Sequence, residues 1–301
     1  MNNKKYRGII APVVTPLTES RKLDKEAVDR IFGMLYEHAI APFILGTTGE
    51  FASLSWDLKR KYVKRAGKLK MKDTILYVGI SSNSFEESVE FGRYSLENGA
   101  DVLVANLPCY YSLTESQMKK YFLDLADVLK APLIVYNIPS TTHMSIPISL
   151  VDELSYHPQI IGTKDSERND ERLQQSITLW KDRKDFSHFI GWAARSVAAL
   201  FSGTDGLVPS TANIAPEIYE EMLIAVEQND LQTANKLQEL SDAWGNLYQG
   251  KTPGESFWAL KVLMEEKGLC SSWMMPPLTE MGEEEKQNLK LKYRNSEFAL
   301  K

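Results

Sequence analysis

Short apolar stretches alternate along the chain with longer segments in which apolar and polar residues follow a helical period. The apolar stretches are rich in β-branched residues, and most are separated by roughly the 25–35 residues that one strand–helix unit needs. Near-continuous apolar strands are typical of a parallel sheet covered by helices. We predict eight such strands, at residues 9–14, 42–45, 74–78, 102–105, 133–136, 160–163, 188–190 and 206–208.

The segments between these strands predict amphipathic helices. In residues 24–39 and 115–129, apolar side chains recur every three or four positions and so share one helix face. Eight strand–helix units indicate an α/β fold of the (β/α)8 TIM barrel type, and a doubly wound sheet is the alternative. After Pro216 the pattern becomes entirely helical. We therefore expect a barrel domain over residues 1–225 and a C-terminal helical region, 226–301, packed on it, with helices at 217–227, 231–249, 255–267 and 283–293.

The composition of the 301 residues fits one large α/β protein. Hydrophobic residues make up 43%, and the formal net charge of −5 arises from interspersed charges of both signs, which does not predict nucleic-acid binding. The N-terminal stretch lacks the apolar segment of a signal peptide, and no run approaches the roughly 20 apolar residues of a membrane helix. Cys109 and Cys270 have no metal or redox spacing. These features predict a cytoplasmic protein without membrane association.

Two polar side chains end neighbouring predicted strands in a way that indicates chemistry. Lys164 closes the apolar run 160–163, and Tyr136 closes the strand that precedes it along the chain. In a TIM barrel the carboxyl ends of the strands meet at one mouth, where active sites lie. Burial disfavours the ammonium form of a lysine and favours the neutral, nucleophilic amine. A buried lysine beside a phenol therefore predicts Schiff-base chemistry on a carbonyl compound.

Two further strand ends carry hydroxyl groups. The second strand is followed by Gly46-Thr47-Thr48-Gly49-Glu50, in which glycines free the backbone to bend and hydroxyls and N–H groups can bind a carboxylate. The fourth strand is followed by Tyr110 and Tyr111. Taken singly, these features are explained by a helix cap, an aromatic packing pair or an ion-pairing lysine. Their meeting at one barrel mouth favours a functional site.

Competing chemistries lack the residues that they need. The four histidines (His38, His143, His157 and His188) have no metal-ligand spacing, so no metal is expected. No Gly-x-Gly-x-x-Gly follows the first strand and no Walker loop is present, so no nucleotide cofactor is expected. The Gly-x-Ser-x-Gly elbow of a hydrolase is also missing. These absences disfavour a metal-dependent aldolase, a nucleotide-dependent enzyme and a hydrolase with that elbow.

Motifs at these strand ends, in their order and spacing, resemble those of the dihydrodipicolinate synthase and N-acetylneuraminate lyase family. The similarity covers nearly the whole chain, from about residue 8 to the C-terminal helices. The motifs are Gly46-Thr47-Thr48-Gly49-Glu50 with Leu54-Ser55, Tyr136-Asn137-Ile138-Pro139, Gly162-Thr163-Lys164-Asp165-Ser166, and the last predicted strand with its continuation, 206–213, which includes Val208.

The resemblance implies a class I reaction, free of any cofactor, in which pyruvate is one substrate. It assigns imine formation to Lys164, proton transfer to Tyr136 and a proton relay to Thr47. Thr48 and neighbouring backbone N–H groups would hold the pyruvate carboxylate. The other residues expected to bind substrate on this ground are Gly46, Gly49 and Val208.

The resemblance also bears on assembly and on the second substrate. Tyr110 matches a tyrosine that reaches into a neighbouring subunit's site, and family members are commonly tetramers built from dimers, so a homo-oligomer is implied. The synthases carry an arginine after the Tyr-Asn-x-Pro motif to bind the second substrate's carboxylate, but this chain has Thr141 there. The lyases carry acidic residues after the glycine of strand seven, where this chain has Trp192 and Arg195. Thr141, Trp192 and Arg195 are therefore expected to shape the second-substrate pocket, with Arg195 as a substitute anion holder.

We predict a pyruvate-dependent aldolase or lyase that makes or breaks a C–C bond between pyruvate and a small aldehyde or 2-oxo acid. The enzymatic alternatives are 4-hydroxy-tetrahydrodipicolinate synthase with a replaced arginine, and an aldolase or dehydratase of 2-keto-3-deoxy sugar acids. A non-catalytic ligand-binding protein is the alternative of another class. The intact lysine, tyrosine and threonine set argues against it, because a sensor gains nothing from an imine-forming amine.

Overall fold

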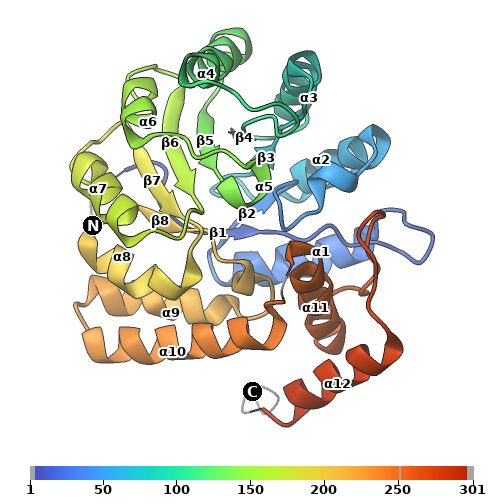
Figure 1. Ribbon diagram of the computed structural model, residues 1–301. Coiled ribbons are helices and arrows are strands. Elements are labelled where there is room, and N and C mark those ends of the chain that lie inside the picture. Colours follow the sequence, from blue (N-terminus) through green and yellow to red (C-terminus); the bar gives the residue numbers. More distant parts are fainter. Residues whose placement is uncertain (1–3, 251, 297–301) are drawn as a thin grey trace.

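Eight parallel strands close into a barrel in the computed structural model, which describes residues 4–250 and 252–296 (Figure 1). The strands pair in the order of the chain, and β8 closes the barrel by pairing with β1. The predicted TIM barrel is therefore confirmed, and the doubly wound sheet is excluded. The strands are β1 (Gly8–Pro12), β2 (Ala41–Ile44), β3 (Tyr77–Gly79), β4 (Val102–Asn106), β5 (Leu133–Asn137), β6 (Ile160–Asp165), β7 (Ser187–Ile190) and β8 (Gly206–Leu207).

Helices surround the barrel and follow the strands in sequence (Figure 1). Several begin at residues whose side chains accept a hydrogen bond from the first turn: Asp24 caps α1, and Thr114 forms a reciprocal capping box with Gln117 at the start of α4. The barrel helices are α1 (Lys25–Glu37), α2 (Trp56–Leu69), α3 (Phe85–Glu97), α4 (Glu115–Leu129), α5 (Pro139–Thr142), α6 (Ile148–Leu154), α7 (Asp170–Trp180) and α8 (Ser196–Ser202).

The apolar side chains form two layers, because successive strand residues point to opposite sides of the barrel wall. One layer lies between the strands and the helices and is the larger. The other fills the barrel interior, and Tyr136 belongs to it at the mouth end of β5. The interior layer consists of Ile10, Phe43, Tyr77, Val102, Val104, Ile134, Tyr136, Ile138, Phe189 and Val208.

The third strand is shorter than expected, covering residues 77–79 instead of 74–78. The backbone N–H of Leu76 donates to the Asp101 carboxylate at 2.8 Å and not to a neighbouring strand. A side chain has taken the place of a ladder partner there, so the strand begins at Tyr77, three residues later than expected. The pattern of apolar residues along the chain does not predict that a side chain will replace a backbone hydrogen-bond partner.

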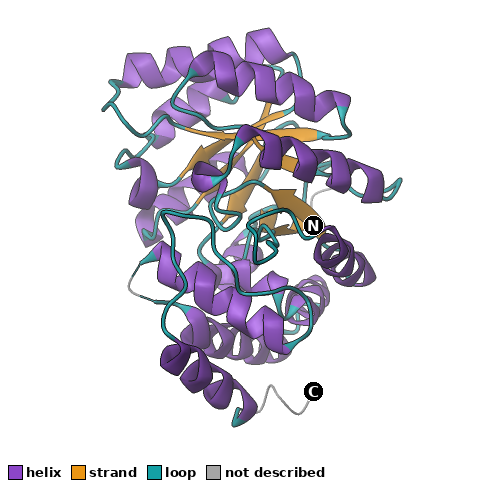
Figure 2. Cartoon of the chain, turned by 90° about the vertical axis from the view of Figure 1, so that its right-hand side faces the viewer, coloured by secondary structure: helices purple, strands orange, loops and turns teal. Residues whose placement is uncertain are grey.

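The C-terminal helices lie on one side of the barrel (Figures 1 and 2). Helix α10 packs on α9 and α11, and α12 contacts α10 and α11. The expected boundary between residues 225 and 226 falls inside α9. These helices are α9 (Pro216–Glu227), α10 (Leu231–Tyr248), α11 (Pro253–Glu266) and α12 (Glu283–Arg294), close to the four ranges expected from the sequence.

Candidate active site

Lys164 and Tyr136 lie side by side at the carboxyl end of the barrel. They occupy paired positions of β5 and β6, and only 6% of Lys164 and 4% of Tyr136 is exposed. The Lys164 Nζ lies 3.9 Å from the centre of the Tyr136 ring and 5.1 Å from that of Phe43. The lysine amine is therefore held between aromatic faces at the inner end of the mouth.

Thr47 extends this pair from the opposite wall. Its Oγ1 lies 3.3 Å from the Tyr136 hydroxyl, at the start of the loop that follows β2. Burial raises the pKa of Tyr136, but the charge of Lys164 and hydrogen bonds with Thr47, Ser166 and Lys164 outweigh it and hold the pKa below its ordinary value. A phenol of lowered pKa that contacts both an amine and a hydroxyl is suited to moving protons between them.

The glycines of the Gly46–Glu50 loop serve close packing. A Cβ on Gly49 would lie 3.0 Å from the carbonyl oxygen of Val13, and one on Gly46 would lie 2.8 Å from the Phe43 ring. The left-handed residues of this turn are the flanking Leu45 (φ 58°) and Glu50 (φ 57°), not the glycines. The bend that we expected the glycines to provide is thus made by their neighbours, and the glycines allow the loop to lie against β1 and β2.

A buried ion pair ties this loop to the C-terminal region. The Lys261 amine, on α11, donates to Glu50, and both side chains are completely buried. The amine also donates to the carbonyl of Trp273 at 2.8 Å, and Glu50 accepts from the backbone N–H of Met275 at 2.8 Å. A segment far along the chain therefore fixes the end of the loop that carries Thr47.

Removing one partner of this pair should destabilise the fold strongly. We expect Lys261→Met or Glu50→Gln to lower the free energy of unfolding by about 3–5 kcal/mol, because each leaves the other group buried without its oppositely charged partner. The double variant should recover part of that loss. Urea unfolding followed by circular dichroism measures these changes.

The exposed pair Lys120–Asp124 provides the matched control. Lys120→Met should change the same quantity by about 0.5 kcal/mol or less, since solvent-exposed ion pairs contribute little. Equal effects at Lys120 and Lys261 would contradict an anchoring role for the buried pair.

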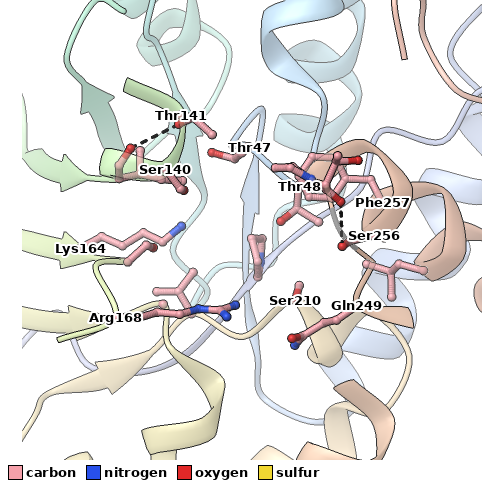
Figure 3. Close-up of a pocket in the computed structure, with 18 of the residues that line it drawn as sticks. Thr47, Thr48, Ser140, Thr141, Lys164, Arg168, Ser210, Gln249, Ser256 and Phe257 are labelled. Carbon is pink, nitrogen blue, oxygen red and sulfur yellow. Dashed lines mark hydrogen bonds between the residues drawn. The ribbon is translucent and has the colours of Figure 1, made fainter. Parts of the chain in front are cut away.

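The barrel mouth opens into a pocket of about 520 Å³, a size typical of small-molecule sites. Thr47, Thr48, Tyr136, Thr141, Lys164 and Val208, all expected from the sequence, line it. Figure 3 shows the side chains converging on the pocket from the barrel strands and from the C-terminal region. Lining residues that the sequence did not single out include Ser140, Ser166, Arg168, Ser210, Tyr248, Gln249, Ser256 and Phe257.

Other expected site residues lie outside this pocket. Arg195 is half-exposed and forms a two-point ion pair with Asp170, at 2.7 and 2.9 Å, while its guanidinium stacks 4.8 Å from the centre of the Trp192 ring. In this structure the Arg195 guanidinium is already paired with Asp170, and the arginine that lines the pocket is Arg168. Tyr110 is 76% exposed and packs edge-on against Tyr111. Gly46 and Gly49 support the loop from behind and do not line the pocket.

The loop after Lys164 is fixed by a second polar network. Asp165 accepts from Arg172 Nε at 2.6 Å and from Asn137 Nδ2 at 3.2 Å. Burial raises the pKa of Asp165, although Arg172 opposes this effect. Glu167 accepts from Asn137 at 3.0 Å and from Ser145 at 2.6 Å. The motif residue Asn137 thus holds the backbone that carries Lys164 in place.

Within residues 4–250 and 252–296, no group of three or more His, Cys, Asp and Glu side chains is arranged to hold a metal ion. The helices of the same residues include none with the length and apolar content to cross a membrane.

Comparison with known proteins matches residues 5–294 to the dihydrodipicolinate synthetase family. The chain belongs to this family. An uncharacterised DapA-like lyase from Pyrococcus abyssi is 32% identical over 92% of this chain and 94% of its own. The dihydrodipicolinate synthase of Bacteroides thetaiotaomicron is 29% identical, with a TM-score of 0.91 over 98% of this chain and all of that one. YagE from Escherichia coli, solved in complex with pyruvate, is 26% identical, with a TM-score of 0.90 over 96% and 98% of the two chains.

Membership confirms the predicted family, and with it the enzyme class. The family's members include lyases and aldolases, so the chain is a carbon–carbon lyase of the aldolase type. The non-catalytic alternative is set aside by this finding.

Proposed function

We propose that this enzyme is a class I aldolase that joins pyruvate, bound as an imine on Lys164, to a small carbonyl compound, or cleaves the resulting product. The observation that carries the proposal is the contact of a buried lysine amine with Tyr136, which in turn contacts Thr47. The complex of the related YagE with pyruvate supports the choice of substrate. Reductive trapping of pyruvate on Lys164 is the experiment that tests the proposal.

The imine forms in two steps. The neutral amine of Lys164 attacks the keto carbon of pyruvate, and the keto oxygen takes up a proton to give a carbinolamine. The carbinolamine nitrogen loses a proton, the hydroxyl leaves as water, and a C=N bond forms. Tyr136 is placed to supply and accept these protons, and Thr47 to exchange them with the pocket.

Carbon–carbon bond formation then uses the methyl group of pyruvate. Loss of a proton from this carbon gives an enamine, whose carbon attacks the carbonyl carbon of the second substrate. The oxygen of that carbonyl takes up a proton and becomes a hydroxyl group. Water then hydrolyses the imine, which releases a 4-hydroxy-2-oxo acid and restores the amine of Lys164.

The pyruvate carboxylate is assigned to the loop that carries Thr47 and Thr48. Thr48 is nearly buried and lines the pocket beside Thr47. The loop combines a hydroxyl with backbone N–H groups, which are donors that can bind a carboxylate. Such an arrangement would leave the rest of the pocket to the second substrate.

Aspartate semialdehyde, the aldehyde substrate in dihydrodipicolinate synthesis, should react poorly. Thr141 stands where the synthases carry a carboxylate-binding arginine, and its hydroxyl can supply one hydrogen bond but no charge. The substrate's ammonium group would also lack an anionic partner, because Glu167, the only acidic residue among the described lining residues, is already engaged by Asn137 and Ser145. We expect a kcat/KM below about 10⁴ M⁻¹s⁻¹, the lower end of the ordinary enzyme range.

Steady-state consumption of pyruvate measures this constant, with an established synthase as the positive control in the same assay. A value at or above about 10⁴ M⁻¹s⁻¹ would assign the chain to the synthases.

The predicted homo-oligomer, with Tyr110 reaching a neighbouring site, and the cytoplasmic location stay predictions.

A further inference from the structure

Arg168 is a cation in the pocket that the reaction steps above do not use. It lies four residues beyond Lys164, in the loop between β6 and α7, and its side chain is exposed at the rim of the pocket. Figure 3 shows its guanidinium extending into the pocket on the same side as Lys164, while Thr47 and Thr48 lie on another side. Among the described residues, this guanidinium forms neither a hydrogen bond nor an ion pair.

The neighbouring charges contrast with this arrangement. Arg172 is paired with Asp165 at 2.6 Å, and Arg195 with Asp170 at 2.7 Å. Glu167, the residue next to Arg168, accepts hydrogen bonds from Asn137 and Ser145 instead. The local carboxylates are therefore committed to other partners, and the Arg168 guanidinium is left facing the pocket without a partner among the described residues. A ligand anion would satisfy it, because a guanidinium fork matches a carboxylate with two parallel hydrogen bonds.

We propose that Arg168 binds a carboxylate on the second substrate, so that the enzyme acts on aldehydes or 2-oxo acids that carry a distal acid group. The products would be 4-hydroxy-2-oxo acids with a second carboxylate at the far end. This inference rests on the proposed function, which assigns the pyruvate carboxylate to the Thr47–Thr48 loop. A pocket of about 520 Å³ has space for such a product beyond the three carbons of pyruvate.

Substrates that differ only in charge test the assignment. Succinate semialdehyde presents an aldehyde and a distal carboxylate, and its methyl ester presents the same chain without the charge. We expect Arg168→Gln to lower kcat/KM for the acid roughly 10- to 100-fold, the range for a charge-assisted hydrogen bond, with little change for the ester. Arg168→Lys should retain part of the preference for the acid.

Arg195→Gln is the matched control, since it removes a nearby arginine that is paired outside the pocket, and it should leave both constants unchanged. Pyruvate trapping with borohydride, done on each variant, separates the two proposals. Wild-type protein that traps no pyruvate would overturn the proposed function itself. Normal trapping with equal losses for acid and ester, or a rise confined to the KM for pyruvate, would overturn the role of Arg168 alone.

Discussion

Lys164→Ala should abolish the covalent attachment of pyruvate and reduce aldol activity to background. Borohydride reduces an imine to a stable secondary amine, so wild-type protein treated with pyruvate and borohydride should gain the mass of one reduced adduct per chain. Peptide mapping should place that adduct on Lys164. The reason is geometric: this buried amine lies against the rings of Tyr136 and Phe43 and lines the pocket, where a bound carbonyl compound can reach it.

Two other buried lysines serve as internal controls in the same experiment. Lys4 donates to Asp205 at 2.7 Å and to two backbone carbonyls, and Lys261 is paired with Glu50. Both amines are engaged by acceptors and neither lines the pocket, so neither should be labelled although both are as buried as Lys164. An adduct on either of them, or one that persists in Lys164→Ala, would exclude an imine mechanism at Lys164.

The sequence predicts the barrel and the inner part of the site because both depend on local order. Strand–helix alternation sets the topology, and residues that end neighbouring parallel strands must meet at one mouth. The pattern alone therefore predicts that Lys164 and Tyr136 lie together, and in the structure they occupy paired positions of β5 and β6.

The outer part of the pocket depends on contacts that no local pattern encodes. Gln249, which follows α10, and Ser256, in the first turn of α11, line the pocket although both are far from Lys164 in the sequence. The choice between Arg168 and Arg195 is likewise set by tertiary partners, since Asp170 captures one guanidinium and no described residue captures the other. The sequence predicted an anion-binding role for Arg195 because of its position after strand seven. It did not predict such a role for Arg168, which lies just beyond the Lys164 motif. The presence of an arginine close to the motif lysine is the sequence feature that could have predicted the place of Arg168 in the pocket.

Tyr136→Phe should reduce kcat by roughly 10²–10⁴-fold, the usual contribution of a general acid–base group. The phenylalanine ring keeps the packing against Lys164 but removes the hydroxyl that contacts Thr47 at 3.3 Å. Without that hydroxyl, the oxygen of the carbinolamine and that of the second carbonyl lack their proton donor. The melting temperature should change little, because the buried apolar surface is retained. The initial rate of pyruvate release from a saturating concentration of a 4-hydroxy-2-oxo acid gives kcat.

Tyr77→Phe is the control that separates chemistry from packing. Tyr77 is buried in the same interior layer of the barrel but does not line the pocket, so the same loss of a hydroxyl should leave kcat within about twofold. Thr47→Val should fall between the two, because Tyr136 keeps its hydroxyl but loses the group that exchanges protons with it. If Tyr136→Phe turned over substrate at the wild-type rate, the hydroxyl would have no part in proton transfer. The lowered pKa of Tyr136 would then reflect only its contact with the charge of Lys164 and the hydrogen bonds around it, with burial acting in the opposite direction.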